Sequence, residues 1–212
     1  MLHYIYDPLC GWCYGAAPLI EVAAQFSAIR LHAGGMMTGS RRQQVTPELR
    51  QFVQPHDLRI AKLTGQPFST AYTDGLLTDY SAVFDSAPPI AAILAAEQLA
   101  GKGLAMLSAL QQAHYQQGRR IADQQTLSAL ASALALKTTD FDTLYLQMLQ
   151  TGVAAHISQT RQLMSQLQAQ SFPSMGLSTA QGIVRLDLTP WFGQATEFAH
   201  WLQQQLKRNS FN

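Results

Sequence analysis

The stretch YIYDPLCGWCYG (residues 4–15) contains the two cysteines of this chain, Cys10 and Cys13. Residues 2–6, LHYIY, form a short run rich in Tyr and Ile that ends at Asp7-Pro8, which predicts a β-strand ending at a turn. After Cys13, apolar residues recur at helical spacing. The pattern therefore places the two cysteines between a strand and a helix.

Two cysteines separated by two residues at the start of a helix suit thiol–disulfide exchange. Unpaired backbone N–H groups and the positive end of the helix dipole favour a thiolate at Cys10. Cys13 lies one turn further in, where it can attack a mixed disulfide and release the partner as a thiol. A purely structural disulfide explains the pair poorly, because so small a loop restrains little of the unfolded chain. We predict Cys10 as the nucleophile and Cys13 as the resolving cysteine.

A CxxC pair also occurs in zinc sites, but a tetrahedral zinc ion needs two further ligands. The sequence has no second CxxC and no HxxxH, and its six histidines are widely scattered. We therefore predict no metal site. A dimer that shares two CxxC pairs escapes this argument, so a non-enzymatic module that carries a soft metal such as Cu(I) or zinc stays open as an alternative.

Composition and charge exclude several functional classes. The formal net charge is +1, and the basic pairs Arg41-Arg42 and Arg119-Arg120 are isolated, so we predict solvated surface pairs and no nucleic-acid partner. No segment has the apolar length needed to cross a bilayer, which predicts no membrane partner. The N-terminal residues lack the basic head and apolar run of a signal peptide, so we expect a cytoplasmic protein. In that reducing compartment, reduction or isomerisation of client disulfides is favoured over net oxidation.

The rest of the chain shows alternating regions of strand and helix patterns. Residues 29–33 indicate a second strand, and residues 88–170 indicate a block of helices rich in Ala, Leu and Gln. Pro55 and Pro67 predict less regular structure over residues 47–78. Towards the C-terminus we predict a β-hairpin and an amphipathic helix, which cover SFPSMGLST (171–179), GIVRLDL (182–188) and FGQATEFAHWLQQQLKR (192–208).

YIYDPLCGWCYG, SFPSMGLST and AHYQQGRRIADQQTLSALASALAL (113–136) together resemble the thioredoxin superfamily. Within it, they resemble the DsbA-like oxidoreductase branch that carries a helical insertion and includes FrnE-like proteins. The resemblance spans nearly the whole chain, and CGWC is its most specific part. It implies an α/β thioredoxin fold (βαβ-α-ββα) with an inserted all-helical domain. The implied boundaries are 1–45 and 155–212 for the thioredoxin-like domain and 46–154 for the helical insertion domain.

The same resemblance implies a cis proline that faces the CxxC pair just before the third strand, and the matching residue is Pro173. Its ring would keep a nitrogen donor away from the sulfurs, and Phe172 would offer backbone groups to an extended substrate. We predict that Trp12, Tyr14, Phe172 and Met175 form an apolar rim that binds protein or small-molecule thiols and disulfides.

Three further residues, Asp7, Met36 and Met37, are predicted to have no direct role in function. Met36 and Met37 are predicted to fill gaps in the core, as methionines commonly do. Asp7 precedes a proline and is predicted to be a turn residue.

The resemblance predicts a protein-disulfide oxidoreductase or isomerase that needs no bound cofactor beyond its redox-active cysteines, with glutathione as an open co-substrate. Gly11-Trp12 differs from the Pro-His of strongly oxidising periplasmic members and from the Gly-Pro of thioredoxins, so we expect a less extreme oxidant than those periplasmic members. The nearest rival is a glutathione-dependent isomerase or transferase of the chromene-carboxylate isomerase or kappa type. Those proteins generally lack an intact CxxC pair. The sequence predicts no oligomeric state.

Overall fold

The computed structural model describes residues 1–210 and contains a four-stranded sheet in the order β2-β1-β5-β6. β1 runs parallel to β2 and antiparallel to β5, and β5 pairs antiparallel with β6. The predicted strands and the predicted hairpin are confirmed. Their bounds are β1 (Leu2–Tyr6), β2 (Ile29–Ala33), β5 (Ser174–Thr179) and β6 (Gly182–Leu186).

Helices surround this sheet and fill the long segment between β2 and β5. α1 (Gly11–Gly15) follows Cys10 and leads into α2 (Ala17–Ala24), and α9 (Ala195–Ser210) ends the described chain. The larger helices of the long segment are α3 (Pro47–Thr64), α4 (Ala87–Ala100), α5 (Gly103–Tyr115), α6 (Gln124–Ala133), α7 (Thr138–Gln147) and α8 (Val153–Gln166). Short helical turns join them: η1 (Gly39–Arg41), η2 (Ala71–Gly75), η3 (Leu76–Thr78) and η4 (Met148–Gly152), with η5 (Thr189–Trp191) before α9.

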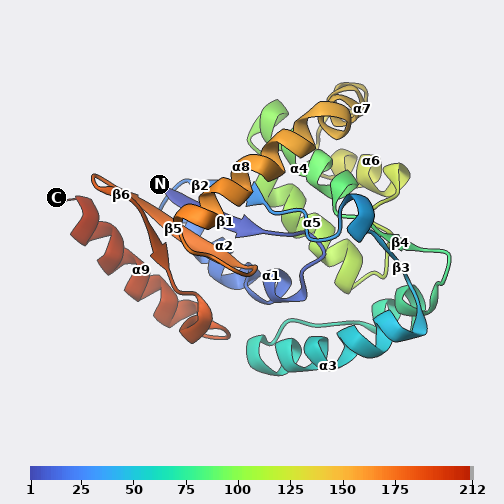
Figure 1. Cartoon of the computed structure of the whole chain (residues 1–212), viewed down its shortest axis with the longest axis horizontal. Coiled ribbons are helices and arrows are strands. Elements are labelled where there is room, and N and C mark those ends of the chain that lie inside the picture. Colours follow the sequence, from blue (N-terminus) through green and yellow to red (C-terminus); the bar gives the residue numbers. More distant parts are fainter. Residues whose placement is uncertain (211–212) are drawn as a thin grey trace.

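Alternate side chains of β1 pack against different helices, as the two-residue period of a strand requires. Tyr4 and Tyr6 belong to the main core cluster, which includes residues of α2 and α9. Ile5 packs instead with Leu163 and Met164 of α8. Figure 1 shows α8 over one face of the sheet and α2 and α9 towards the other. β1 is therefore buried on both faces, and the site at its carboxyl end rests on a rigid support.

α3 is one continuous helix that passes through Pro55, so the predicted irregularity is wrong for residues 47–64. The helix is well capped: Thr46 accepts a hydrogen bond from Leu49 N–H (3.1 Å), and Gly65 ends it in the left-handed conformation (φ 75°). Pro55 lies on the exposed side, where water can bond the carbonyl that lacks a helical partner. Capping at both ends and exposure at the proline explain why the helix is not interrupted.

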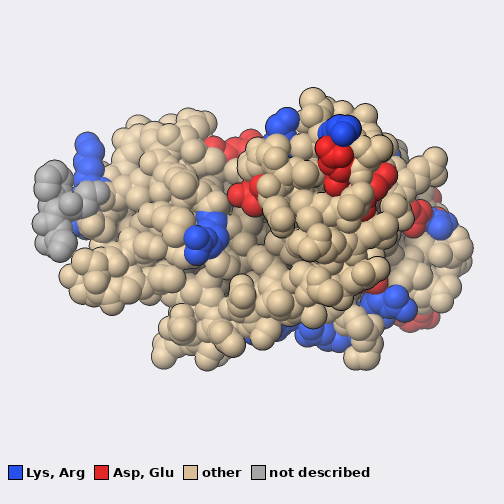
Figure 2. Space-filling view, turned by 90° about the horizontal axis from the view of Figure 1, so that it is seen from above, with Lys and Arg blue, Asp and Glu red and all other residues tan. Residues whose placement is uncertain are grey.

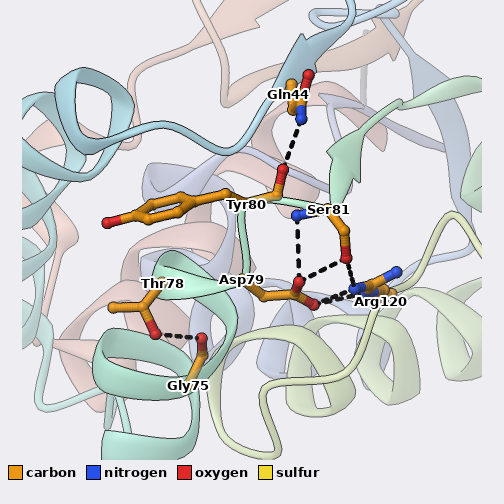
Figure 3. Close-up of polar contacts among 7 residues, drawn as sticks. All are labelled: Gln44, Gly75, Thr78, Asp79, Tyr80, Ser81 and Arg120. Carbon is orange, nitrogen blue, oxygen red and sulfur yellow. Dashed lines mark hydrogen bonds and ion pairs between the residues drawn. The ribbon is translucent and has the colours of Figure 1, made fainter.

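A small antiparallel ladder adds to the predicted helical insertion. It pairs β3 (Gln43–Gln44) with β4 (Val83–Phe84). Beside it, the side-chain amide of Gln44 donates to the carbonyl of Tyr80 at 2.5 Å (Figure 3). The ladder attaches the chain before α3 to the chain before α4.

An ion pair between Asp79 and Arg120 fastens the same region to the chain after α5. The guanidinium Nε of Arg120 donates to Asp79 Oδ2 at 2.7 Å, and the Ser81 hydroxyl donates to Asp79 Oδ1 at 2.8 Å (Figure 3). Arg120 is partly exposed and takes part in a local surface network that the sequence did not predict.

The charged side chains on the surface are of both signs, as expected for a protein with a formal net charge of +1. On the face shown in Figure 2, Lys and Arg side chains stand at separate points, with Asp and Glu among them. Within residues 1–210, none of the helices is apolar over a length that would cross a bilayer. The domain boundaries at residues 45 and 155 stay predictions.

Candidate active site

Cys10 occupies the position just before α1, where the backbone is still extended (φ −86°, ψ 113°). Its carbonyl accepts the first helical hydrogen bonds, from the N–H groups of Cys13 (2.9 Å) and Tyr14 (3.1 Å). The Sγ of Cys10 lies 3.7 Å from the carbonyl oxygen of Phe172, to which the thiol donates. The residue is 7% exposed. The structure therefore places Cys10 at the start of a helix, next to the loop before β5, as the sequence predicted.

Cys13 lies one turn inside α1 and is fully buried, and both cysteines are free thiols. Burial raises the pKa of the Cys13 thiol well above its usual range, and the neighbouring Cys10 raises it further. Such a thiol stays protonated and out of reach of a large client. The two sulfurs thus differ in access, which is what an attacking and a resolving cysteine require.

The Phe172–Pro173 peptide bond is cis, as the family resemblance implies. The ring of Phe172 packs against Gly34, where an added Cβ would lie 2.0 Å from the ring. Arg161 places its guanidinium 5.8 Å from the ring centroid and donates two hydrogen bonds to the Gly34 carbonyl (3.0 and 2.7 Å). Because Gly34 has no side chain, the Phe172 ring can pack on its backbone. In this position of the ring, the Phe172 carbonyl faces Cys10.

Asp7 is fully buried between β1 and α1 and joins three segments. Its Oδ1 accepts from Leu9 N–H (3.0 Å) and from the Ser86 hydroxyl (2.8 Å), and its Oδ2 accepts from Met36 N–H (2.6 Å). Desolvation raises the pKa of this carboxyl, and the three hydrogen bonds oppose the rise. The bond to Leu9 confirms the predicted turn, while the other two connect that turn to the loop after β2 and to the start of α4.

A cavity of about 200 Å³ opens beside Cys10. Its lining is mostly apolar and comes from three regions: the cysteine motif, the loop after β2, and the helical segment from α3 to α5. The motif contributes Cys10, Gly11 and Trp12. A small thiol or the side chain next to a client disulfide fits a space of this size and polarity.

Trp12 is half-buried and lines this cavity, so its predicted partial exposure is confirmed. Its ring meets the Phe192 ring edge-on at 5.3 Å, and the Arg59 guanidinium lies over it at 5.8 Å. Met36 and Met37 are also half-buried and line the cavity. They pack against the main core cluster, as predicted, and they also line the cavity, which the sequence did not predict. Asp7 and Ser86 accept hydrogen bonds from the backbone N–H groups of Met36 and Met37 and so hold this loop beside the cavity.

Tyr14 and Met175 do not belong to an exposed rim, and their prediction as rim residues is wrong. Tyr14 is buried by the helical insertion: its ring stacks on Tyr115 at 4.7 Å, and its hydroxyl donates to the Pro67 carbonyl at 2.8 Å. Met175 is fully buried in β5, which lies between β1 and β6. Phe172 is half-buried and turns its ring towards Gly34, while its carbonyl faces the sulfur.

Three polar side chains in the cavity were not predicted from the sequence. Asp57 on α3 accepts a hydrogen bond from the Tyr72 hydroxyl at 3.1 Å, and burial raises its pKa to about 7. His114 on α5 is buried, its pKa is lowered to about 3 by desolvation, and its Nδ1 has no hydrogen-bond partner among residues 1–210. His56 is exposed at the cavity edge. These residues lie more than 40 positions from the cysteine motif, and no local pattern connects them to it.

Solved structures similar to this chain are disulfide oxidoreductases. The cytosolic disulfide reductase DsbM from Pseudomonas aeruginosa is 48% identical, with a TM-score of 0.91 over 97% of this chain and 98% of that one. The same reductase solved with GSH gives a TM-score of 0.90 over the same shares. A candidate protein disulfide isomerase from Nitrosomonas europaea shares the fold at 24% identity, with a TM-score of 0.75 over 96% and 97% of the two chains.

No protein-family model matches the sequence, and a search of curated proteins finds no match. The identity to the Pseudomonas reductase nevertheless extends over almost the full length of both chains. The fold, the strand–CxxC–helix geometry and this identity agree with one another. The chain belongs to the DsbA-like branch of the thioredoxin superfamily and is a thiol–disulfide oxidoreductase.

Proposed function

We propose that the protein is a cytoplasmic disulfide reductase that takes its electrons from glutathione. In the first step the Cys10 thiolate attacks a client disulfide and forms a mixed disulfide, which releases one client thiol. Cys13 then attacks Cys10, releases the second client thiol and leaves a Cys10–Cys13 disulfide. Two glutathione molecules reduce that disulfide and leave as oxidised glutathione, so two electrons pass from glutathione to the client.

The difference in access between the two sulfurs carries this proposal. The Sγ of Cys10 faces the Phe172 carbonyl beside an open cavity, whereas Cys13 is fully buried one helical turn away. An extended client that pairs with the backbone at Phe172 would bring its sulfur to Cys10 first. Only a sulfur already bonded to Cys10 would then lie within reach of Cys13.

Glutathione and the cytoplasm are proposed on the similarity to the Pseudomonas reductase, whose structures are described as cytosolic and, in one case, as a complex with GSH. The lining of the cavity supports a small thiol substrate, since it is apolar with few polar groups. Protein or small-molecule disulfides are the proposed clients. The redox-active cysteines are proposed as sufficient, with no resident cofactor.

Coupled turnover tests the proposal. The protein is supplied with glutathione, glutathione reductase and NADPH, and reduction of an uncharged small disulfide is followed by NADPH consumption. The wild type is expected to turn over, and Cys10→Ser is expected to be inactive. Cys13→Ser is expected to accumulate a mixed disulfide on Cys10, seen as a mass increase of one half of the client disulfide or, after exchange with glutathione, of one glutathionyl group. Turnover by Cys10→Ser, or a glutathionyl group on Cys13, would overturn the assigned order.

Two alternative functions give different results in related assays. A glutathione-dependent isomerase or transferase would keep its activity in Cys13→Ser, because its chemistry does not need the second sulfur. A soft-metal module would bind zinc or Cu(I) stoichiometrically through both cysteines and lack dithiol activity. Among residues 1–210 the structure contains no group of three or more His, Cys, Asp or Glu arranged to hold a metal ion.

A further inference from the structure

We propose that Asp57, on the helical insertion, is the proton donor and acceptor for the thiols exchanged at Cys10. The inference rests on the proposed function, because it assigns the protons that the exchange must move. It extends that function by giving the insertion a chemical role beyond covering the cysteine motif.

The carboxyl of Asp57 lies close to the cysteine motif. Asp57 and Cys10 line the same cavity, and a Cβ added to Gly11 would lie 3.0 Å from Asp57 Oδ1. The carboxyl thus packs against the residue that follows the attacking cysteine. A larger side chain at residue 11 would push it away.

The two oxygens of this carboxyl have different partners. Oδ2 accepts the hydrogen bond from Tyr72, which fixes the orientation of the group. Oδ1 has no hydrogen bond within the described part of the chain, and it is the oxygen closest to Gly11. Oδ1 is therefore the oxygen that can exchange a proton with a sulfur held in the cavity beside Cys10.

The surroundings of Asp57 bring its pKa close to neutral pH. Desolvation raises its pKa, while the Tyr72 hydrogen bond and the charge of His56 lower it, and the balance is about 7. A general acid–base group works best when its pKa lies near the working pH. The titratable groups around it on the neighbouring elements are His56, Cys10, Tyr72, His114 and Tyr115, and Asp74 lines a second cavity with it.

The buried groups in that set do not compete for the role. Desolvation lowers the pKa of His114 to about 3, so its ring stays neutral. Desolvation raises the pKa of Tyr72 and of Tyr115, so both hydroxyls stay protonated. Among the described residues that line this cavity, Asp57 is the one carboxyl, so it is the group left to exchange protons there.

The proton transfers balance over one reaction cycle. When the Cys10 thiolate attacks a client disulfide R–S–S–R′, the Cys10–S–R bond forms, the S–S bond breaks, and R′S⁻ leaves with the electron pair. Protonated Asp57 gives its proton to R′S⁻, which leaves as R′SH. Cys13 then attacks Cys10, and its proton leaves on the second client thiol, RSH. The first glutathione gives its proton to the Asp57 carboxylate and attacks Cys10 in the Cys10–Cys13 disulfide, which forms a Cys10–glutathione disulfide and releases the Cys13 thiolate. The second glutathione gives its proton to Cys13 and attacks the glutathione sulfur of that mixed disulfide, which releases oxidised glutathione and restores the Cys10 thiolate. Neutralising the leaving sulfur matters here because an apolar cavity disfavours a free thiolate.

Single-turnover kinetics test this role. Reduced protein is mixed with excess bis(2-hydroxyethyl) disulfide, an uncharged probe, and the loss of protein thiols is timed across a range of pH for the wild type and Asp57→Asn. The wild type is expected to react about tenfold faster than Asp57→Asn at about pH 6, where Asp57 is protonated. The ratio is expected to fall towards 1 through a midpoint near pH 7, following the pKa of Asp57.

Tyr72→Phe supplies a second readout that a merely structural role would not change. The Tyr72 hydrogen bond lowers the pKa of Asp57, so its loss is expected to move the midpoint to higher pH. Asp140→Asn is the matched control, because Asp140 is an exposed carboxyl on α7 that pairs with Lys137 and lines no cavity with Asp57, and it is expected to give the wild-type profile. Thermal unfolding checks that each variant is folded.

The outcomes separate this inference from the proposed function. A rate ratio that is flat with pH, or a midpoint that stays in place in Tyr72→Phe, would overturn the role of Asp57 while leaving the oxidoreductase chemistry intact. A wild type that does not react with the disulfide at any pH would instead overturn the proposed function.

Discussion

The two walls of the cavity beside Cys10 are built in different ways. The wall formed by the cysteine motif is held by short-range bonds, such as those that the Cys10 carbonyl accepts from Cys13 and Tyr14. The opposite wall comes from α3 and α5 and presents Asp57, which is held by a side-chain bond from Tyr72. The first wall places the sulfur that reacts, and the second surrounds it with groups that control protons and access. Redox chemistry and its tuning are therefore supplied by separate parts of the chain.

The largest expected contrast lies within the first wall, between its two sulfurs. Brief treatment of the reduced protein with iodoacetamide is expected to alkylate Cys10 faster than Cys13 by on the order of 100-fold, because Cys13 is buried and its pKa is raised. Peptide mass spectrometry after timed quenching measures the two rates. Equal alkylation of the two cysteines would show that the structure assigns their access wrongly.

Gly34→Ala tests how the first wall depends on the loop before β5. The new methyl group would lie 2.0 Å from the Phe172 ring, and Arg161 restricts the room for that ring to move. We expect a loss of about 2 kcal/mol in the free energy of unfolding and slower exchange at Cys10. Urea unfolding measures the free energy of unfolding, and the coupled assay measures the rate of exchange at Cys10. Gly75→Ala is the control, since the nearest atom to its new methyl group, the Thr70 carbonyl oxygen, is 3.9 Å away. Equal losses in both variants would contradict the packing around Gly34.

Asp57→Asn tests the second wall through stability. The folded-state pKa of about 7 lies above the ordinary value of 3.8, so the folded protein binds more protons between these values and loses stability as the pH rises through them. Asn does not titrate, so the variant is expected to gain about 4 kcal/mol over the wild type at pH 8 relative to the difference at pH 4. Urea unfolding at both pH values measures this. A pH-independent difference would contradict a carboxyl of raised pKa.

Tyr14→Phe is expected to have the smallest effect. It removes the hydroxyl that donates to the Pro67 carbonyl and accepts from the Gln116 amide, at a cost of about 1 kcal/mol in the free energy of unfolding. Turnover with small disulfides is expected to stay at the wild-type rate, because Tyr14 is buried away from the cavity lining. A raised KM with unchanged stability would restore Tyr14 to the substrate rim.

The sequence predicted the first wall well because its signals are local. The strand before Asp7, the cysteine spacing and the hairpin after Pro173 each occupy a few consecutive residues, and the structure has all of them. Trp12 was correctly predicted to be partly exposed. Tyr14 was not, since its burial depends on Tyr115, which is distant in sequence and comes from the helical insertion.

The second wall was not predicted because it exists only after the insertion folds back. Asp57 and His114 lie on different helices, and each looks like an ordinary polar position in its own segment. Pro55 indicated irregular structure where α3 is in fact continuous, which hid the helix that carries Asp57. A search for polar residues on the inward face of a capped helix would have suggested Asp57, because it lies three positions before the buried Ile60.

The central claim is that Cys10 and Cys13 form a reversible redox pair. Equilibrating the protein in a series of glutathione redox buffers, and measuring the fraction of Cys10–Cys13 disulfide in each by mass spectrometry after alkylation, tests it directly. We predict one two-electron transition at a potential more negative than about −120 mV, the value of a strongly oxidising periplasmic relative, because Gly11-Trp12 lacks the histidine of that relative. The absence of any reversible disulfide in this series would contradict the account.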